Sequence, residues 1–430
     1  MKVFAPKIFT AFKNHQAKDY ASDIIAGIIV AIIALPLSIA LAIASGATPE
    51  TGLFTAIIAG FFTALLGGSK VNITGPTAAF ATIVAGIILD QGMSGLFLAT
   101  IMAGILLILM GLLRLGSLIK YIPHTITVGF TAGIAVTLVV GQLKDFLGLT
   151  YPSGTTAIET MEKLTLVAEN FSTFNPWAFG IGLLGLAILI LWTKISKKIP
   201  GSLIAVLIGA LVCLIPAIQV NTIGSLYTIS SSLPTFQFPE ITGERILILL
   251  PSAFTIALLA GIESLLSCVV SDKMIDDKHN SNTELIALGT SNLLVGFFGG
   301  IPATGAIART AANVKNGGKS PISGMVHAIV LLLVLVLLMP LASYIPMPII
   351  AAILFIVAYN MSEWREFVAV IKTKKWNDIL VLVLTFALTV IFDLVKAIAV
   401  GLVLHYAIIL IYKAIKKRKA EQQTQEKSQA

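Results

Sequence analysis

Long apolar segments follow one another along almost the whole chain, separated by short polar breaks. A helix of about 20 apolar residues can cross the hydrocarbon core of a bilayer. The pattern predicts fourteen membrane spans, over residues 23–45, 51–67, 76–89, 93–113, 124–143, 176–193, 200–218, 246–270, 284–299, 303–314, 321–343, 347–360, 377–392 and 394–412. The sequence therefore predicts an all-α polytopic membrane protein.

The composition supports this interpretation. Of the 430 residues 57% are hydrophobic and only 12% are charged, and the mean hydropathy is +0.96. A soluble protein carries about 25% charged residues, so lipid must solvate much of this surface. Metalloprotease, phosphate-loop, nucleophile-elbow and cysteine-cluster motifs are absent from the sequence. We therefore expect no enzyme activity, no metal centre and no cofactor.

The basic residues fit one orientation of the chain. With both termini cytoplasmic, 24 of the 29 Lys and Arg residues fall in predicted inside segments. An excess of this kind is expected of cytoplasmic loops. The net charge of +8 thus reflects topology and requires no nucleic-acid partner. We expect a multi-pass protein of the inner (plasma) membrane.

The chain divides into two halves that echo each other. "GFFTALLGG" before "ITGPTAAFAT" is matched by "GFFGG" before "PATGAIART", and "KYIPH" by "SYIPM". Because each half holds seven spans, the second copy must be inverted, which is typical of transporters. The predicted order is a cytoplasmic segment 1–22, a first repeat 23–218, an extracellular linker 219–244, a second repeat 245–413 and a cytoplasmic tail 414–430.

Two of the spans are too short to cross the membrane, and they occupy corresponding places in the two repeats. Residues 76–89 and 303–314 reach about 20 Å as helices, against a hydrocarbon core of about 30 Å. Each follows glycines and residues that favour extended backbone, so we expect two half-spanning helices preceded by short strands that pair with each other. The two helix N-termini would then face one another near the membrane centre. Free N–H groups and positive dipole ends make such a place an anion site.

Two charged residues are predicted inside spans close to this site. Arg309 follows Ala308 in the second short helix and would add a fixed cation suited to oxyanions. Glu263 is the only carboxylate that the pattern places well inside a span, and Ser267 lies one turn further along the same face. Intramembrane charges normally mark a transport pathway, and Glu263 could carry a proton. The alternative is that Glu263 and Arg309 form a static buried ion pair.

Other candidates for anion contact follow from their positions. Those at the helix starts could offer backbone or hydroxyl donors, or serve only as helix caps. Those after Pro36 could be turned toward the site by a proline kink. The set comprises Thr77, Ala78, Thr304, Gly305, Leu37 and Ser38.

These stretches resemble the sulfate permease (SulP) family of anion transporters. The resemblance rests on "ALPLSIALAIASG", "GGSKVNITGPTAAFATIV" and the long segment from "GIESLLSCVVSD" to "GGKSPISG". It implies fourteen spans in two inverted seven-span repeats and a homodimer. It also implies that spans 1–4 and 8–11 move like an elevator against spans 5–7 and 12–14. The anion site would lie between spans 1, 3, 8 and 10.

The resemblance also assigns roles by position. Arg309 matches an arginine that many relatives have at the start of the tenth span, and Glu263 matches the acidic position of the eighth. Cyanobacterial sodium-dependent bicarbonate members have Asp and Thr where this chain has Glu263 and Ser267, and they lack the arginine. Most members continue into a STAS domain, which is not found here. The chain is either a naturally short member or a shortened one.

The favoured hypothesis is secondary active transport of a small inorganic or carboxylate anion, sulfate or a dicarboxylate, coupled to protons. Sodium-coupled bicarbonate symport, a passive anion channel and a nucleobase permease are the alternatives. Arg309 argues against a neutral nucleobase. A channel and a transporter differ in whether the gate ever opens on both sides of the membrane at once. No motif in the sequence distinguishes the two.

Overall fold

A computed structural model of the chain describes residues 4–11, 15–117, 123–152, 154–155, 157–196, 199–391 and 400. The predicted span 394–412, apart from residue 400, and the predicted tail lie outside these ranges. Contacts divide the chain into two units. Unit 1 holds Met1–Ile119 and Leu138–Ala358, and unit 2 holds Lys120–Thr137 and Tyr359–Ala430.

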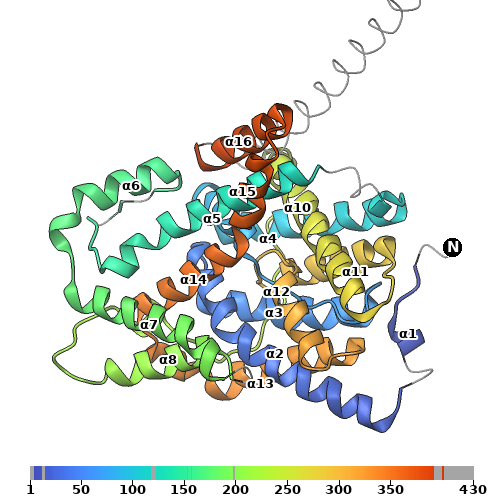
Figure 1. The fold of residues 1–430 in the computed structure, drawn as a ribbon, viewed down its shortest axis with the longest axis horizontal. Coiled ribbons are helices and arrows are strands. Elements are labelled where there is room, and N and C mark those ends of the chain that lie inside the picture. The colour runs from blue at the N-terminus through green and yellow to red at the C-terminus, as the bar shows by residue number, and fades with distance from the viewer. Residues whose placement is uncertain are drawn as a thin grey trace, which may run out of the picture. The chain divides into compact units, whose positions relative to one another are not determined.

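The part of the chain that the structure describes is mainly helical (Figure 1). Its longer helices are α2 (Ala17–Ala44), α3 (Pro49–Leu66), α4 (Ala81–Leu112), α5 (His124–Leu147), α7 (Pro176–Ile195), α10 (Gly243–Ile275), α11 (Ser281–Phe297), α13 (Pro321–Leu338), α14 (Met347–Met361) and α16 (Trp376–Ile391). Its shorter ones are α1 (Ile8–Ala11), α6 (Thr160–Glu169), α8 (Gly201–Val212), α9 (Ile223–Leu226), α12 (Ile307–Lys315) and α15 (Trp364–Lys372). Among its 3₁₀ helices are η2 (Ala78–Phe80), η4 (Phe171–Thr173) and η5 (Met339–Tyr344).

Each predicted span within the described residues coincides with a helix. Eight helical segments are long and apolar enough to cross a membrane, and α8 and α16 are shorter apolar helices. The predicted break between residues 89 and 93 falls at Gly92, where a backbone with φ 68° and ψ −176° interrupts α4. Glycine adopts this conformation without the steric penalty of a Cβ. The expectation of an all-α membrane protein is confirmed.

Several boundaries differ from the prediction. Helix α2 begins at Ala17, six residues early, because Gln16 and Asp19 form a capping box. Helix α8 ends at Val212 rather than at residue 218. The polar connection 145–175 contains the short helix α6, and α15 is an amphipathic helix that the span prediction left out.

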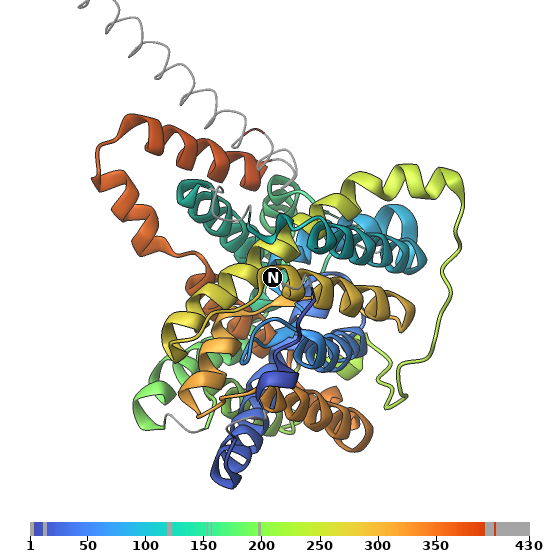
Figure 2. The same ribbon diagram turned by 90° about the vertical axis from the view of Figure 1, so that its right-hand side faces the viewer.

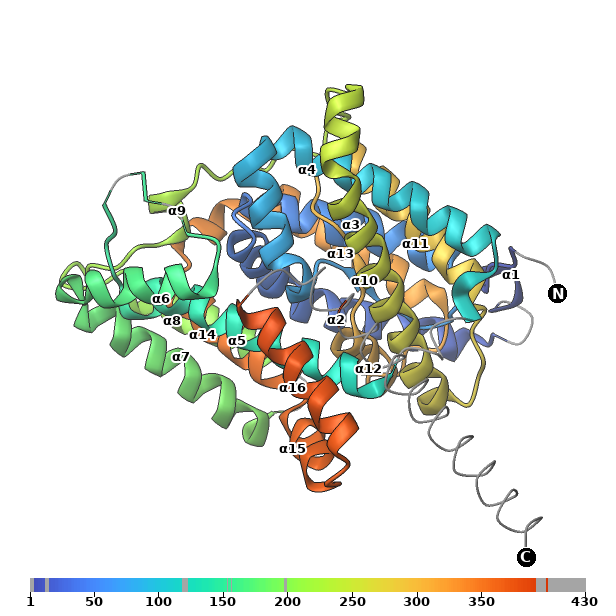
Figure 3. The same ribbon diagram turned by 90° about the horizontal axis from the view of Figure 1, so that it is seen from above.

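Unit 1 depends on close helix packing between α4 and α11. A Cβ on Gly104 would lie 2.6 Å from the Gly289 carbonyl oxygen, and a Cβ on Gly289 would lie 2.5 Å from that of Gly104. Two glycines therefore let the backbones touch, as small residues commonly do between membrane helices. Figure 3 shows α10 and α11 running beside α4.

The connection 219–244 is largely irregular and is fastened to unit 1 at several points (Figure 2). The Ser230 N–H donates to Glu50 at the start of α3 at 2.8 Å, and the Gln237 N–H donates to the Phe297 carbonyl at 2.6 Å. Phe236 also stacks on Phe297. The predicted linker is thus held against unit 1 by these contacts.

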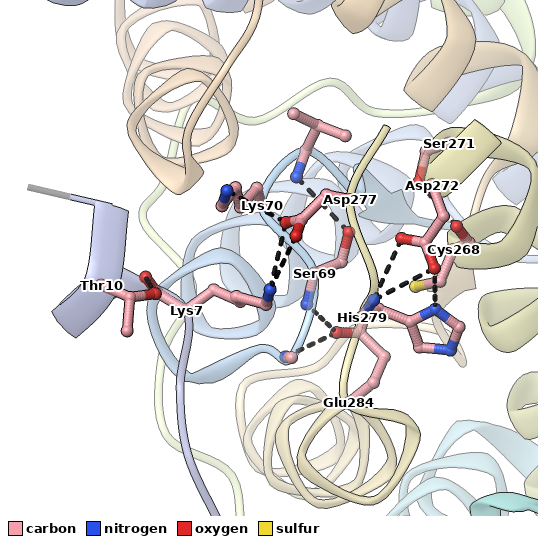
Figure 4. A network of polar contacts seen from close by, with 12 residues as sticks. Lys7, Thr10, Ser69, Lys70, Cys268, Ser271, Asp272, Asp277, His279 and Glu284 are labelled. Atoms are coloured by element: carbon pink, nitrogen blue, oxygen red, sulfur yellow. Dashed lines mark hydrogen bonds and ion pairs between the residues drawn. The ribbon is translucent and has the colours of Figure 1, made fainter. Parts of the chain in front are cut away.

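The turn between α10 and α11 gathers charged side chains (Figure 4). Asp277 pairs with Lys7 and Lys70, each at 3.1 Å, which fastens the N-terminal segment and the loop after α3 to the turn. Burial opposes ionisation of Asp277, but hydrogen bonds from the Lys278 backbone and from the two lysines lower its pKa below the ordinary value. Asp272 bonds His279 Nδ1 at 2.7 Å in the same turn.

Unit 2 is built by α15, α16 and the first part of α5. A Cβ on Gly129 would lie 2.7 Å from the Leu382 carbonyl oxygen, so α5 approaches α16 closely. Phe367 of α15 contacts Phe386 of α16 edge to face, at 5.5 Å between ring centroids.

Candidate functional site

Two short strands meet at the centre of unit 1. Strands β1 (Thr74–Gly75) and β2 (Thr304–Gly305) pair antiparallel, with Thr74 opposite Gly305 and Gly75 opposite Thr304. The Ala306 N–H extends the ladder to the Ile73 carbonyl at 2.8 Å. The predicted pairing of the two extended stretches is confirmed. It satisfies backbone groups that have no water partner at this depth.

A helix follows each strand, and neither helix start has a side-chain cap. Thr77 precedes η2 and α4, and Ala306 precedes α12, both in extended conformation without a cap hydrogen bond from the side chain. The helix start expected at residue 303 lies at Ile307, because Thr304 and Gly305 belong to β2. The first N–H groups of such helices lack intrahelical partners. Two uncapped starts beside one strand pair make a place for negative charge.

Glu263 of α10 reaches the first of these helix starts. The Thr77 hydroxyl donates to Glu263 Oε2 at 3.0 Å, so Thr77 holds a carboxylate instead of capping its own helix. Both residues are half-buried, whereas Ala308 in the first turn of α12 is exposed. Glu263, the residue before the first helix and the first turn of the second helix are therefore each at least partly exposed.

Arg309 lies behind this surface and is almost fully buried, with 4% of its surface exposed. Its Nη2 donates to the Pro76 carbonyl at 3.0 Å, and its Nη1 has no hydrogen-bond partner. Within the described ranges no ion pair joins Arg309 to Glu263, so the static pair considered as an alternative is not formed. The space beside Nη1 exists because residue 75 is glycine: a Cβ there would lie 2.4 Å from that nitrogen.

Ser267 belongs to a different part of the site than expected. It is fully buried, and its Oγ lies 2.8 Å from Asn72 Oδ1 and 3.0 Å from Thr310 Oγ1. Asn72 in turn donates to Glu284 Oε1 at 2.7 Å. This chain of bonds links α10, the loop before β1, α11 and α12. Ser267 thus stabilises the buried residues beneath the site. Among the described residues, no hydrogen bond joins it to Glu263.

Other predicted residues also lie away from the accessible surface. The Thr304 hydroxyl donates to the Ala260 carbonyl at 2.7 Å, and Gly305 packs against Ser264, so both serve the strand pair. Ala78 is buried in the first turn of η2. Leu37 packs against the apolar cluster around Ile349.

Ser38, the next residue of α2, is fully buried, with an unpartnered hydroxyl. Pro36 lies inside α2 without ending the helix.

Several polar residues that the sequence reasoning missed are buried here. Glu284 is fully buried and accepts hydrogen bonds from the N–H groups of Gly68 and Ser69 at 2.8 and 3.1 Å (Figure 4). Its position at the end of a predicted span concealed its burial. Asn72 belongs to "VNITGP", which served in the prediction only as an extended stretch. For His327, near a predicted span end, the sequence favours packing or interface contacts over proton relay.

The chain matches a known family and curated proteins along most of its length. The model of the sulfate permease family matches residues 20–410. "Putative sulfate transporter YvdB" of Bacillus subtilis is 44% identical over 402 residues, which cover 92% of this chain and 74% of that protein. "Bicarbonate transporter BicA" of Picosynechococcus is 32% identical over 398 residues, covering 89% of this chain and 69% of that protein.

Solved structures share the fold. The transmembrane domain of a cyanobacterium bicarbonate transporter BicA superimposes with a TM-score of 0.79 at 30% identity, covering 91% of this chain and 98% of that one. Murine Slc26a9, an anion transporter solved in the inward-facing state, gives a TM-score of 0.86 over 95% of this chain and 71% of that one. Its 18% identity supports the fold alone.

Proposed function

Because this chain belongs to the sulfate permease family of anion transporters, we propose that it is a secondary active transporter of sulfate or a dicarboxylate, coupled to protons. The observation that carries the proposal is a half-buried carboxylate, Glu263, which is bonded to Thr77 at one uncapped helix start and forms no ion pair with the buried cation Arg309. A static ion pair would hold both charges permanently, whereas separate charges leave each free for a mobile partner.

The anion would bind at the two helix starts. The exposed first turn of α12, around Ala308, supplies backbone N–H donors, and the buried helix start at Ala78 adds its dipole, which favours negative charge. Arg309 contributes a positive potential from behind, fixed by its bond to the Pro76 carbonyl. In a low-dielectric surrounding this charge acts over several ångströms, because the interaction of two charges weakens only in proportion to distance and dielectric constant.

Glu263 would couple the anion to a proton. An ionised carboxylate next to the anion repels it, and protonation removes that repulsion. Anion binding and proton binding therefore favour one another by the same factor, as linkage requires. The Thr77 hydroxyl can accept a bond from the protonated carboxyl or donate to the ionised one, so it can hold Glu263 in both states.

The remaining parts of the proposal concern movement and assembly. The antiparallel pairing of β1 with β2 is what two inverted repeats would produce, and it supports an elevator-type cycle in which the paired strands and their helices move together. We further propose a homodimer in the plasma membrane with both termini cytoplasmic, as the distribution of Lys and Arg predicts.

Sodium-coupled bicarbonate symport is the second candidate. The relative named bicarbonate transporter BicA, at 32% identity, favours it. The Glu263 carboxylate and the Thr77 hydroxyl offer oxygen ligands of the kind that a hard cation prefers. In this case Glu263 would remain ionised and bind the cation instead of a proton.

Uptake into proteoliposomes separates these functions. We would measure accumulation of labelled sulfate, bicarbonate, fumarate and chloride under a proton gradient alone and a sodium gradient alone. The proposal expects proton-driven accumulation of sulfate or fumarate above equilibrium. Sodium-driven bicarbonate accumulation would establish the second candidate, and purely downhill movement of every anion would refute both.

The Glu263→Gln variant tests the coupling residue. It should abolish proton-driven accumulation but leave anion exchange across the membrane, because amide and protonated carboxyl have the same charge. Glu169→Gln, at an exposed position of α6, is the matched control and should transport as wild type does. Undiminished proton-driven accumulation by Glu263→Gln would remove this residue from the mechanism.

A further inference from the structure

The imidazole of His327 is buried without a partner in the interior of unit 1. The residue lies in α13 with none of its surface exposed, and neither ring nitrogen has a hydrogen bond. It faces Gly60 of α3: a Cβ on Gly60 would lie 3.2 Å from His327 Nδ1 and 3.5 Å from the Thr74 carbonyl oxygen. The ring therefore lies near strand β1, at a place where residue 60, a glycine, contributes no side chain. We call this place the back of β1.

Arg309 reaches the same strand from α12. Its Nη1 is buried without a partner beside Gly75, the residue after Thr74. A Cβ on Gly60 would adjoin both the His327 ring and the Thr74 carbonyl, so the two side chains approach consecutive residues of β1. Three groups thus approach one strand: a guanidinium N–H that can only donate, a carbonyl that can only accept, and an imidazole whose neutral form can do both.

Leaving such atoms unpaired is costly. Each buried polar atom without a partner loses the interactions that it had with water, and native proteins rarely tolerate several in one place. Buried waters typically make about three hydrogen bonds and satisfy such groups. An anion would suit Nη1, but it would also face the Thr74 carbonyl oxygen. A mixed set of donors and acceptors fits water better.

We propose an internal hydration site behind β1, in which water accepts a hydrogen bond from Arg309 Nη1 and donates to His327 or to the Thr74 carbonyl. This assigns His327 as a positioning residue for the anion site, a role that rests on the proposed function. Nη2 holds the Pro76 carbonyl on one side, and Nη1 is held through the water on the other. The guanidinium then keeps its place behind the helix starts while the anion enters and leaves.

The structural test is a high-resolution cryo-EM map of the wild-type protein in nanodiscs, in a buffer without sulfate. We expect density within hydrogen-bonding distance of both Arg309 and His327, unchanged when bromide replaces chloride. A direct contact between the two side chains with no density between them would overturn the proposal. Density that grows with bromide would also overturn it, by identifying an anion site.

The functional test compares His327→Leu with His327→Gln, which keeps one donor and one acceptor. In uptake of labelled sulfate, His327→Leu should raise KM about tenfold with Vmax changed less than about twofold, and His327→Gln should recover most of the loss. Equal behaviour of the two variants, or a KM unchanged by His327→Leu, would refute a positioning role.

Gly60→Ala provides a second variant should the histidine variants not fold. Its methyl group would occupy the space next to His327 Nδ1 and displace the water, so KM should again rise. Gly180→Ala in α7, where a Cβ meets nothing within 4 Å, is the matched control and should leave KM unchanged. If the wild type transports none of the tested anions, the proposed function fails, and the map still decides whether the hydration site exists.

Discussion

The substitution Gly75→Ala should weaken anion binding through Arg309 alone. The added Cβ would lie 2.4 Å from Arg309 Nη1, whereas ordinary contacts begin at 3.4 Å, so the guanidinium must move by about 1 Å. The backbone itself accepts alanine, because Gly75 has no positive φ and extended conformation suits a residue before proline. The perturbation is therefore confined to the side chain of Arg309.

A movement of this size would break the bond between Nη2 and the Pro76 carbonyl, now 3.0 Å. A hydrogen bond to a charged group contributes roughly 1.5–3 kcal/mol. If that energy holds the charge at the anion site, its loss should weaken anion affinity by about tenfold to a hundredfold. The relevant measurement is the dissociation constant for sulfate, from titration calorimetry or from the dependence of thermal stability on sulfate concentration.

A double-mutant cycle with Arg309→Ala decides whether the reasoning is right. Once the guanidinium is absent, Gly75→Ala has nothing to displace and should cost almost nothing further. Gly86→Ala in α4, where a Cβ meets nothing within 4 Å, controls for the change of residue type. Additive losses from Gly75→Ala and Arg309→Ala would show that residue 75 acts by another route and would refute the steric argument.

Three further substitutions test neighbouring contacts. Thr77→Val removes the 3.0 Å bond to Glu263, so proton-driven uptake should shift its pH dependence while Thr77→Ser behaves as wild type; an identical pH profile for Val would contradict the role. Glu284→Gln places an NH₂ group, which can only donate, where the carboxylate now accepts three hydrogen bonds. It should therefore lower the apparent Tm in detergent by roughly 5 °C. An unchanged Tm would show that these hydrogen bonds do not stabilise the fold. The lowered pKa of Asp277 stabilises the fold above the ordinary pKa of the carboxyl, and this stabilisation is lost as pH falls through the lowered value. Asp277→Asn should therefore cost about 1 kcal/mol near pH 7 and nothing in strong acid, and a double-mutant cycle with Lys7→Met measures their coupling.

The sequence determined the membrane class and most of the helices. Apolar runs of span length have few other physical outcomes in a chain with 12% charged residues, so each described span became a helix. The break at Gly92 and the extended stretches before two short helices were also visible, because glycine and proline act through local backbone sterics. These features depend on neighbouring residues along the chain.

Side-chain partners could not be found in the same way. Glu263 and Arg309 were identified by the cost of a charge inside an apolar run, yet whether they pair depends on which way two helices turn. Ser267 lies on the same helix as Glu263 but bonds Asn72, which is almost two hundred residues away. Helical periodicity predicts which side chains share one face of a helix, but it does not predict which residues that face contacts.

The anion site shows which features follow from the sequence alone and which require the tertiary structure. The residue pattern by itself predicted two helix starts after paired strands, with a cation and a carboxylate nearby, because these properties are local. Only the fold decided that Thr77 donates a hydrogen bond to Glu263 and that Arg309 donates one to the Pro76 carbonyl. It also decided that His327 lies near β1. Each of these contacts joins residues more than a hundred positions apart, and their geometry is set by how closely glycines let helices and strands approach.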